Sequence, residues 1–352
     1  AVLGVLAVAC GASFALTGAG AAEEPQAPSA ESFALAGASV RLEETNPGLR
    51  FTSALSKAEY EALSAEYDIQ AGMLIIPASE LTGELTLENK TDEVMNVVTA
   101  TYAPVDAEGS PVAEESAVNY QFRAVVSDIP EGAYGAEVLG RGYLSLTSKA
   151  AEDAEAFVLY TETLSRNVAY VAYKAKTNES WDPEQEAVLD EFIGERQFFA
   201  VSAADDAGAD YDYAYAGQTV NVALGEGCFA FRAETESGVQ AGKSEFTMPA
   251  EAVTLKGVSA EITPADAALD ANRSAENGGV PTCDVSKNIS VSEGELADYA
   301  GLISYRSSNG AVATVNENGL VTAVGGGTAE IFAKLGDTAE QKIADISVTA
   351  WT

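Results

Sequence analysis

The stretch that decides the fold is YRSSNGAVATVNENGLVTAVGGGTAEIFA, which runs from Tyr305 to Ala333. Within it, Val312 and Val315 precede a polar Asn-Glu-Asn-Gly turn, and apolar residues then resume until three consecutive glycines interrupt them. Apolar runs separated by such residues predict a β-hairpin followed by a second turn. Polarity alternates over residues 328–333, and residues 343–348 form a further strand. This spacing predicts a small β-sandwich.

The same stretch resembles a known domain family. Its pattern SSN-x-x-VATV-N-x-N-GLVTAV-x-x-GTA-x-I-x-A is similar to the signature of the bacterial immunoglobulin-like domain, group 2, and the resemblance covers about residues 258–352. Tyr305-Arg306 stands where the family usually has Trp-Ser, and residues 265–279 read as an inserted acidic, Ala-rich loop. The resemblance implies an extracellular spacer or adhesive module of bacterial surface proteins, and not an enzyme.

Length and charge limit the partners that we expect. The chain has 352 residues, which suffices for about two to four domains. It carries 19 Lys and Arg against 54 Asp and Glu, which gives a formal net charge of -35. Such a surface repels phosphate backbones and anionic membranes, so we expect no nucleic-acid partner and membrane contact only through a leader or an anchor outside this sequence. We expect a monomer that meets an extracellular glycan or protein ligand.

The sequence contains no histidine, which removes several kinds of catalytic and metal site. Ser-His-Asp and Cys-His nucleophiles and His-ligated zinc are excluded, whereas carboxylate chemistry, Ser-Lys dyads and calcium remain. A glycosidase would need two carboxylates that face each other across a cleft, and no stretch presents such a pair in an otherwise apolar run. We therefore expect no enzymatic activity.

Residues 1–22 are apolar and uncharged and contain an A-x-A motif at 19–21. This pattern predicts a secretory signal peptide over residues 1–21. Two alternatives stay open, namely lipoprotein processing at Cys10 and a retained transmembrane anchor. Each of them places the rest of the chain outside the cytoplasm, so we expect an extracellular or cell-surface protein. Residues 22–32, rich in Ala, Pro and Glu, are expected to form a flexible linker.

Two cysteines remain after the leader, Cys228 and Cys283. Two thiolates cannot complete a four-cysteine zinc site, so these residues form one disulfide or stay free. They fall in different expected modules, and a disulfide between them would require their Cα atoms to lie within about 7 Å.

Residues 33–177 predict a β-rich domain with short helices. Alternating polarity predicts strands at 38–42, 49–53 and 120–126, and an apolar run at 71–76 ends at a proline. A capping box of Ser56 and Glu59 predicts a helix over 56–67, and helical spacing of apolar residues runs from Leu164 to Ala175. In order, the segments GASVRL, PGLRF, GMLIIP and LSRNV resemble an uncharacterised domain of secreted surface proteins of Gram-positive gut bacteria. No activity follows from that resemblance.

The next residues predict a connector and a second small module. Asp182 and Pro183 predict a helix start in a connector over residues 178–212, which ends in the acidic, loop-like stretch AADDAGADYD from 203. Residues 213–257 predict strands, and their motifs AGQTVNVA and FTMPAEAVTL resemble the internalin-type B-repeat, although the usual Gly-Trp is missing. Residues 258–352 complete the chain. We expect a mainly β protein: an N-terminal β-rich (α+β) sandwich-like domain, a small β module and a C-terminal immunoglobulin-like β-sandwich.

Arginines supply the candidate ligand-binding site. In a chain this acidic, several guanidinium groups on strands could line a groove for a carboxylate or an acidic glycan. The alternative is that each arginine pairs with a local carboxylate and holds sheet edges together. Tyrosines such as Tyr143 could add a sugar-stacking surface, or could be ordinary half-buried strand residues. The candidate ligand-binding residues are Arg41, Arg50, Arg123, Arg141 and Tyr143.

The acidic stretch after residue 203 supplies a candidate metal site. Asp205, Asp206, Asp210 and Asp212 offer the hard oxygen ligands that Ca²⁺ requires, so calcium is the one cofactor that the sequence could accommodate. The spacing does not match an EF-hand, and the alternative is a solvated acidic loop.

Together these features predict a secreted, non-catalytic surface protein of a Gram-positive-type bacterium. Its expected work is adhesion or ligand display by residues 33–177, held at a distance by spacer modules. Two alternatives stay open: a carbohydrate-binding or carbohydrate-degrading component, and a purely structural stalk.

Overall fold

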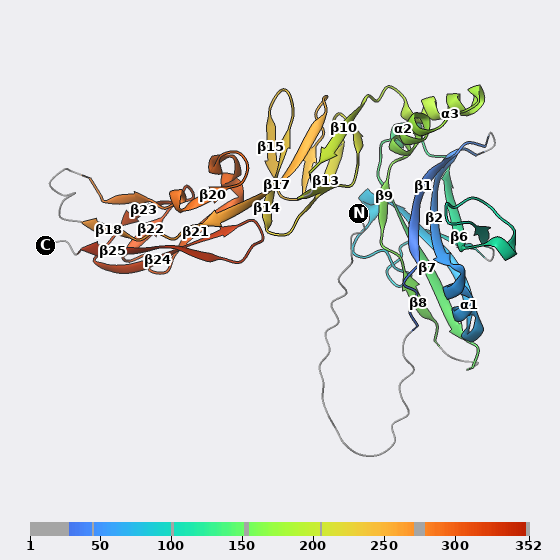
Figure 1. The fold of residues 1–352 in the computed structure, drawn as a ribbon, viewed down its shortest axis with the longest axis horizontal. Helices are drawn as coiled ribbons and strands as arrows, with labels where there is room; N and C mark the ends of the chain where they lie inside the picture. Colours follow the sequence, from blue (N-terminus) through green and yellow to red (C-terminus); the bar gives the residue numbers. More distant parts are fainter. Residues whose placement is uncertain are drawn as a thin grey trace, which may run out of the picture.

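The computed structural model describes residues 28–43, 46–99, 102–150, 155–204, 206–270 and 279–349. The expected signal peptide and Cys10 lie outside the described residues. Figure 1 shows an elongated molecule in which three β-rich regions follow one another: an N-terminal region (28–193), a middle region (198–257) and a C-terminal region (258–349). The fold is mainly β, as predicted from the sequence.

The N-terminal region contains two antiparallel sheets whose inner faces pack together. The first has the order β1-β2-β6-β5 and the second the order β4-β3-β7-β8, with β9 also paired to β7. Gly140 and Gly142 of β7 lie directly against Phe51 and Ser53 of β2, so the two sheets approach each other closely there. The strands are β1 (Ala34–Arg41), β2 (Gly48–Ser56), β3 (Tyr67–Pro77), β4 (Met95–Thr99), β5 (Ala103–Val105), β6 (Asn119–Ser127), β7 (Val138–Ser148), β8 (Phe157–Tyr160) and β9 (Leu164–Arg166).

The helix that follows β2 is α1 (Lys57–Glu66), and Ser56 caps it as predicted, with its Oγ accepting from the backbone N–H of Glu59. The expected capping box is incomplete. Instead of returning to Ser56, the Glu59 carboxylate accepts hydrogen bonds from the backbone N–H groups of Glu31 and Ser32 at 3.0 and 2.9 Å. The last residues of the expected flexible linker are therefore fixed to α1.

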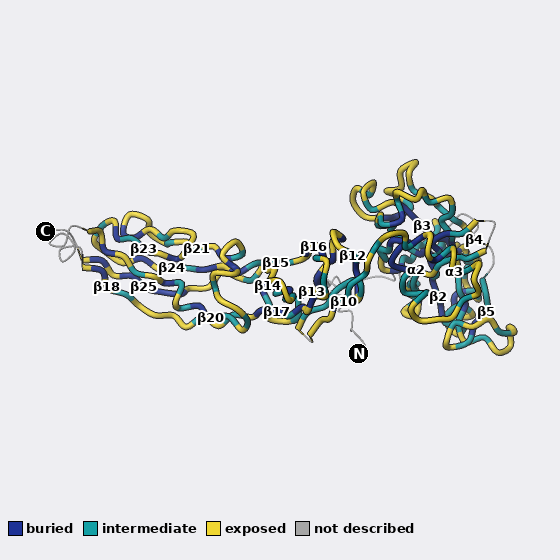
Figure 2. Tube along the Cα trace, turned by 90° about the horizontal axis from the view of Figure 1, so that it is seen from above, coloured by how far each residue is buried: buried dark blue, intermediate teal, exposed yellow. Residues whose placement is uncertain are grey.

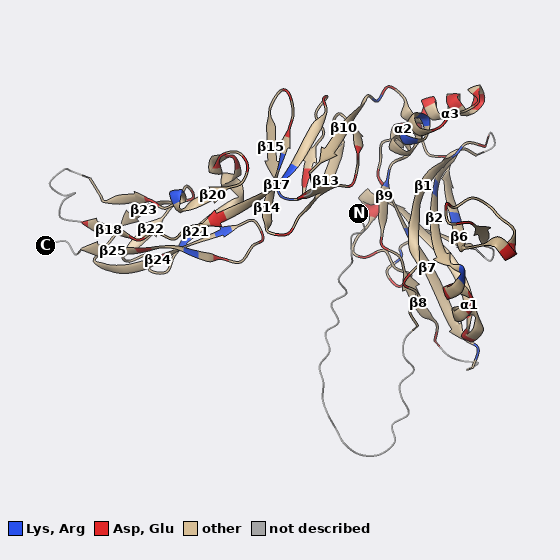
Figure 3. Ribbon diagram, viewed as in Figure 1, with Lys and Arg blue, Asp and Glu red and all other residues tan. Residues whose placement is uncertain are grey.

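Two helices, α2 (Val168–Asn178) and α3 (Pro183–Ile193), cover one end of the sandwich. The sequence placed the start of helical spacing at Leu164, and this is wrong by four residues: Leu164–Arg166 pair with β7, and Asn167 caps α2. The capping box predicted at Asp182 is present. Lys176 of α2 forms ion pairs with Glu186 and Asp190 of α3, which carries most of the acidic residues at this end (Figure 3).

The middle region contains a sheet of order β12-β10-β17-β14-β15 and a smaller sheet of order β11-β13-β16. The stretch from residue 203 was expected to be a loop, but it contains β11, which pairs with β13. A strand of three residues is too short to show a periodic pattern, so the sequence did not indicate it. The expected limits of connector and module stay predictions. The strands are β10 (Phe198–Ala203), β11 (Ala207–Ala209), β12 (Tyr213–Tyr215), β13 (Thr219–Leu224), β14 (Cys228–Glu234), β15 (Val239–Gly242), β16 (Glu245–Thr247) and β17 (Val253–Ile262).

The C-terminal region is a β-sandwich of sheets β18-β25-β24-β21 and β19-β23-β22. The predicted hairpin is confirmed: β22 and β23 pair on either side of the Asn-Glu-Asn-Gly turn. Residues 267–270, expected within an inserted loop, instead form β18, because Leu269 is buried in the sandwich. The strands are β18 (Ala267–Asp270), β19 (Thr282–Asp284), β20 (Ile289–Val291), β21 (Ile303–Ser307), β22 (Ala313–Val315), β23 (Leu320–Ala323), β24 (Gly327–Leu335) and β25 (Gln341–Thr349).

The middle and C-terminal regions share one long strand. The first residues of β17 pair with β10 and β14, and its last residues pair with β20. Figure 2 shows buried segments continuing through this junction. The remaining elements are short 3₁₀ helices: η1 (Ala78–Glu80), η2 (Glu114–Ser116), η3 (Glu131–Ala133), η4 (Ser286–Asn288) and η5 (Leu296–Leu302).

Cys228 and Cys283 are both free thiols, which settles the choice that the sequence left open. Cys228 lies in β14 and Cys283 in β19. Burial raises the pKa of each thiol, so at neutral pH both stay protonated.

Candidate functional site

The outer face of the first sheet carries three of the four predicted arginines. Arg41, Arg50 and Arg123 lie in β1, β2 and β6, as predicted. The strand registers place Arg41 diagonal to Arg50, and Arg50 diagonal to Arg123, on the face turned away from the sandwich core. We call this set the arginine face.

The arginine face holds few carboxylates. Arg41 pairs with Glu43, and its Nε atom is buried with no hydrogen-bond partner among the described residues. Arg123 donates from Nε and Nη2 to the Gln121 Oε1 atom at 3.3 and 2.7 Å. The Arg50 side chain makes no hydrogen bond or ion pair within the described residues, although its backbone belongs to the strand ladder. The expectation that each arginine pairs with a local carboxylate therefore fails at two of these three positions.

Electrostatics distinguish Arg50 from its neighbours. Burial lowers its pKa, the positive charges of Arg123 and Arg41 lower it further, and Glu43 only partly opposes them. A guanidinium group remains protonated in proteins, so the shift records an unfavourable environment for the positive charge rather than its loss. An anion bound beside Arg50 would offset the repulsion from Arg123 and Arg41.

Two shallow hollows flank Arg50. One, of about 500 Å³, is lined by Glu43, Asp182 and Glu184 as well as Trp181, and these carboxylates would repel an anion. The other, of about 220 Å³, is lined by polar and basic side chains only, apart from small residues of β1. It presents Ser39, Arg50, Thr52, Gln121 and Arg123. A carboxylate group suits the second hollow.

Arg141 and Tyr143 lie on the second sheet, away from the arginine face. Arg141 donates from Nε to the Thr161 carbonyl at 2.9 Å and pairs with Glu84 at 2.7 Å, with its guanidinium 4.6 Å from the centre of the Tyr160 ring. Tyr143 is 2% exposed and donates to Asn96. Both side chains already have partners within the protein, so the predicted site divides into an arginine face and a structural pair.

The acidic residues of the candidate calcium site point in different directions. Asp206 accepts from the backbone N–H of Gly257, and Asp210 accepts from Asn221. Asp212 accepts from Tyr170 and Lys174. Asp205 lies outside the described residues, and among the described ones no group of three or more Asp, Glu, Cys or His is arranged to hold a metal ion. The calcium site stays a prediction.

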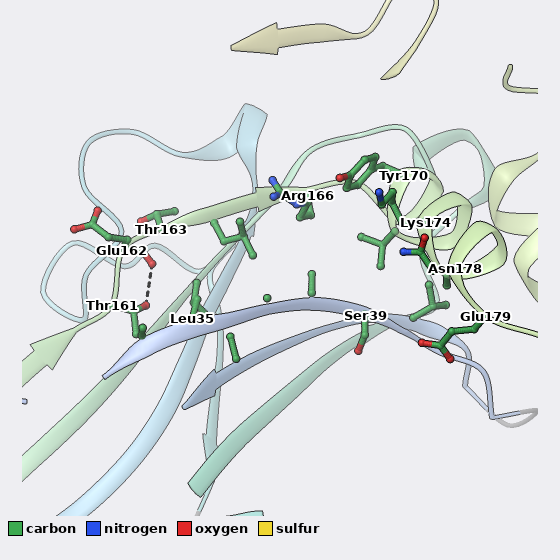
Figure 4. A pocket seen from close by; sticks show the side chains of 18 of the residues that line it. Leu35, Ser39, Thr161, Glu162, Thr163, Arg166, Tyr170, Lys174, Asn178 and Glu179 are labelled. Carbon is green, nitrogen blue, oxygen red and sulfur yellow. Dashed lines mark hydrogen bonds between the residues drawn. The ribbon is translucent and has the colours of Figure 1, made fainter. Parts of the chain in front are cut away.

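Sequence reasoning missed a groove along the open edge of β1 (Figure 4). It has a volume of about 860 Å³ and lies between β1 on one side and β9 and α2 on the other. Arg166, Tyr170 and Lys174 line it from β9 and α2, and Leu35 lines it from β1. The small residues of ALAGASV, from Ala34, line one side of it and were a sequence signal that could have indicated it.

No helix among the described residues is both long and apolar enough to cross a membrane.

Comparison with known proteins supports one part of the chain. Residues 303–350 match the family model of the Big-like bacterial Ig-like domain, and no curated protein matches the chain. Among solved structures, extracellular domains 3-5 of Drosophila OTK align with 93% of this chain and 99% of that chain at 8% identity, with a TM-score of 0.16, which is too low to indicate a common fold. The other module resemblances stay predictions. The C-terminal region therefore contains a bacterial Ig-like domain, a kind of module that is generally non-catalytic.

Proposed function

We propose that this protein is a non-catalytic extracellular module that binds a carboxylate-bearing ligand on the arginine face. The observation that carries the proposal is the crowding of Arg41, Arg50 and Arg123, of which only Arg41 forms an ion pair within the described residues. The chain has 54 Asp and Glu, so local ion pairs would have been easy to form. The predicted leader and the bacterial Ig-like domain support an extracellular location.

The chemistry of the arginine face favours a carboxylate over a neutral ligand. Guanidinium groups bind carboxylates through two parallel hydrogen bonds, and such charge-assisted bonds are roughly twice as strong as neutral ones. Gln121, Ser39 and Thr52 offer further donors in the same hollow. The carboxylate belongs either to an acidic glycan or to an acidic protein segment, and the experiment below separates these sources.

The C-terminal two regions act as a spacer in this proposal. The shared strand β17 and the packing of Phe229 against Tyr299 join them into one continuous unit. Such a unit holds the N-terminal region at a fixed distance from whatever anchors the chain. A carbohydrate-degrading role would need an opposed pair of carboxylates, and no carboxylate lines the hollow of about 220 Å³.

The experiment is a calorimetric titration of the full chain with three polymers: a polyuronate, polyglutamate and neutral dextran. We compare the wild type with Arg50→Gln and Arg123→Gln, and with Lys287→Gln as a charge-matched control, because Lys287 lies on the exposed surface of the C-terminal region. We expect a carboxylate polymer to bind and dextran not to bind. Loss of one charge-assisted contact, at about 1.5–3 kcal/mol, should weaken binding by roughly tenfold or more in either arginine variant.

The two carboxylate polymers separate the glycan from the protein ligand, since only the matching backbone should bind tightly. If Lys287→Gln weakens binding as much as Arg50→Gln does, the loss of affinity in the arginine variants reflects net charge and not a site on the arginine face. If neither carboxylate polymer binds, the proposal is contradicted, and a purely structural stalk explains the protein better.

A further inference from the structure

Strand β1 is an unpaired edge of the first sheet. The order β1-β2-β6-β5 leaves one side of β1 open, and no backbone hydrogen bond to that side is recorded among the described residues. A register shift between Leu35 and Gly37 interrupts the pairing with β2, and the regular edge then runs from Gly37 to Arg41. Proteins usually protect such an edge with Lys, Pro or a covering element, and this segment has neither Lys nor Pro.

The sandwich is open along the same edge. In β2 alternate residues are fully buried, whereas every residue of β1 is half-buried or exposed. Leu35, Ala38 and Val40 face the core and pack against it, yet remain partly uncovered. Residues of α2 pack against part of this apolar surface, and the part that they leave uncovered borders the groove of about 860 Å³, where a further strand would lie.

The opposite wall of the groove has a defined charge pattern. Leu164, Val171 and Ala175 supply apolar surface, and Arg166 projects from the same wall near its centre (Figure 4). Lys174 also lines this wall, but its charge is paired with Asp212. The Arg166 guanidinium lies 5.2 Å from the centre of the Tyr211 ring and forms no ion pair within the described residues. Glu162 and Glu179 stand toward the two ends of the groove, and Glu31 is a third carboxylate in its lining.

We propose that the groove binds an extended acidic peptide segment of a partner protein, which adds to β1 as a further strand.

The occupant follows from the shape and charge of the groove. A strand pairs with the open backbone of residues 37–41, a ladder that spans about 17 Å at roughly 3.3 Å per residue. Its inward side chains are apolar, because they cover Leu35, Ala38 and Val40. Its carboxylates lie near the centre, within reach of Arg166, and away from Glu162 and Glu179 at the ends. The small side chains of β1 let a second backbone approach without a clash.

The groove adjoins the arginine face, because residues 36–39 line both the groove and the hollow of about 220 Å³, but the two sites use different side chains. Ser39 points from β1 to the outer face, whereas Leu35 points into the groove (Figure 4). Binding in the groove depends on backbone pairing, and binding on the arginine face depends on side-chain charge alone. An experiment can therefore refute strand addition to β1 without refuting carboxylate binding on the arginine face, and the reverse.

The test uses the full chain and a peptide of about nine residues that alternates valine with glutamate. Hydrogen exchange followed by mass spectrometry reports which backbone amides the peptide protects, and fluorescence anisotropy reports its affinity. We expect slower exchange in fragments that span residues 34–41, with no change in the β22–β23 hairpin as the internal control. Arg166→Gln should weaken binding by about tenfold, as expected for one charge-assisted contact.

Two control peptides separate pairing from charge. Replacing the central valines by proline keeps every carboxylate but removes the N–H groups that a ladder needs, so this peptide should lose most of its affinity. Replacing glutamate by lysine should abolish binding. Equal binding of the proline peptide, or protection only outside residues 34–41, would overturn the inference. If polyuronate binding remains while the valine-glutamate peptide leaves β1 unprotected, the strand-addition site is refuted and the arginine face is not.

Discussion

At the scale of single residues, Glu137 joins three segments of the fold through hydrogen bonds, and no sequence motif indicates this role. Its carboxylate accepts hydrogen bonds from Ser165 at 2.7 Å, Asn167 at 2.8 Å and Tyr211 at 2.6 Å. Tyr211 is 1% exposed, and Asn167 is fully buried where it caps α2. Burial, followed by the charge of Glu137, raises the pKa of Tyr211, so its hydroxyl remains a donor at all physiological pH values.

We predict that Glu137→Ala destabilises the protein by about 2–4 kcal/mol, because it leaves the buried groups of Asn167 and Tyr211 without an acceptor. The measurement is urea unfolding followed by circular dichroism. Glu131→Ala is the matched control, since Glu131 is exposed and makes no side-chain hydrogen bond among the described residues. A change within about 0.5 kcal/mol for both variants would show that water replaces Glu137 without cost.

The candidate site shows what the residues alone could reveal. Alternating polarity placed Arg41, Arg50 and Arg123 on strands correctly, because that signal is local. Their common face depends on which strands pair and in which register, and these are long-range choices that no short pattern records. Arg141 has the same local pattern and lies on the other sheet, which is why the sequence grouped it with the rest.

At the scale of secondary-structure elements, the close contact of β2 with β7 sets the spacing of the N-terminal sandwich. Gly140 of β7 has no side chain where Phe51 of β2 fills the core, and Phe51 itself is fully buried. A Cβ atom at Gly140 would lie 2.6 Å from a ring carbon of Phe51. The ring is enclosed and cannot move away without displacing its neighbours.

We predict that Gly140→Ala destabilises the protein by about 1–3 kcal/mol through overpacking. Gly132→Ala is the control, because a Cβ atom there meets nothing within 4 Å. Thermal unfolding of both variants measures the difference. A stabilised Gly140→Ala would mean that the sheets adjust freely and that unfolded-state entropy decides the effect.

Elements differ in how far their own sequence determines them. The β22–β23 hairpin could be predicted in full, since its turn residues and its apolar runs agree. The start of α2 was missed because Leu164 fits both a helical spacing and a strand, and pairing with β7 decides between them. Strands β11 and β18 are short and are paired with distant segments, so they carry no periodic signal of their own.

At the scale of the whole molecule, a network of charges ties the middle region to the C-terminal region. Arg232 of β14 bonds to Glu234 at 2.9 Å and to Asp298 of η5 at 2.7 Å. Lys256 of β17 bonds to Glu234 and Glu293 at 3.1 and 3.2 Å. A chain of net charge -35 thus places two of its few basic residues where they bridge the two regions.

This network should make the junction sensitive to acid. Hydrogen bonds from Arg232 and then Lys256 lower the pKa of Glu234, and a backbone hydrogen bond followed by one from Arg232 lowers that of Asp298. A carboxyl whose pKa is lowered on folding contributes stability above its usual value, and that contribution disappears as the pH falls through its folded pKa. We therefore expect the contribution of Arg232 to be complete at pH 7 and to decline below about pH 4.

The measurement is the difference in unfolding free energy between the wild type and Arg232→Gln, followed by urea titration from pH 7 to pH 3. The difference should shrink as the pH falls, because protonated Glu234 and Asp298 no longer attract the guanidinium. Lys334→Gln removes the same charge from an exposed site of β24 and should show a small difference at every pH. A difference for Arg232→Gln that stays constant to pH 3 would mean that packing beside Tyr299, and not charge, joins the two regions. The proposed spacer would then keep its stiffness in acid.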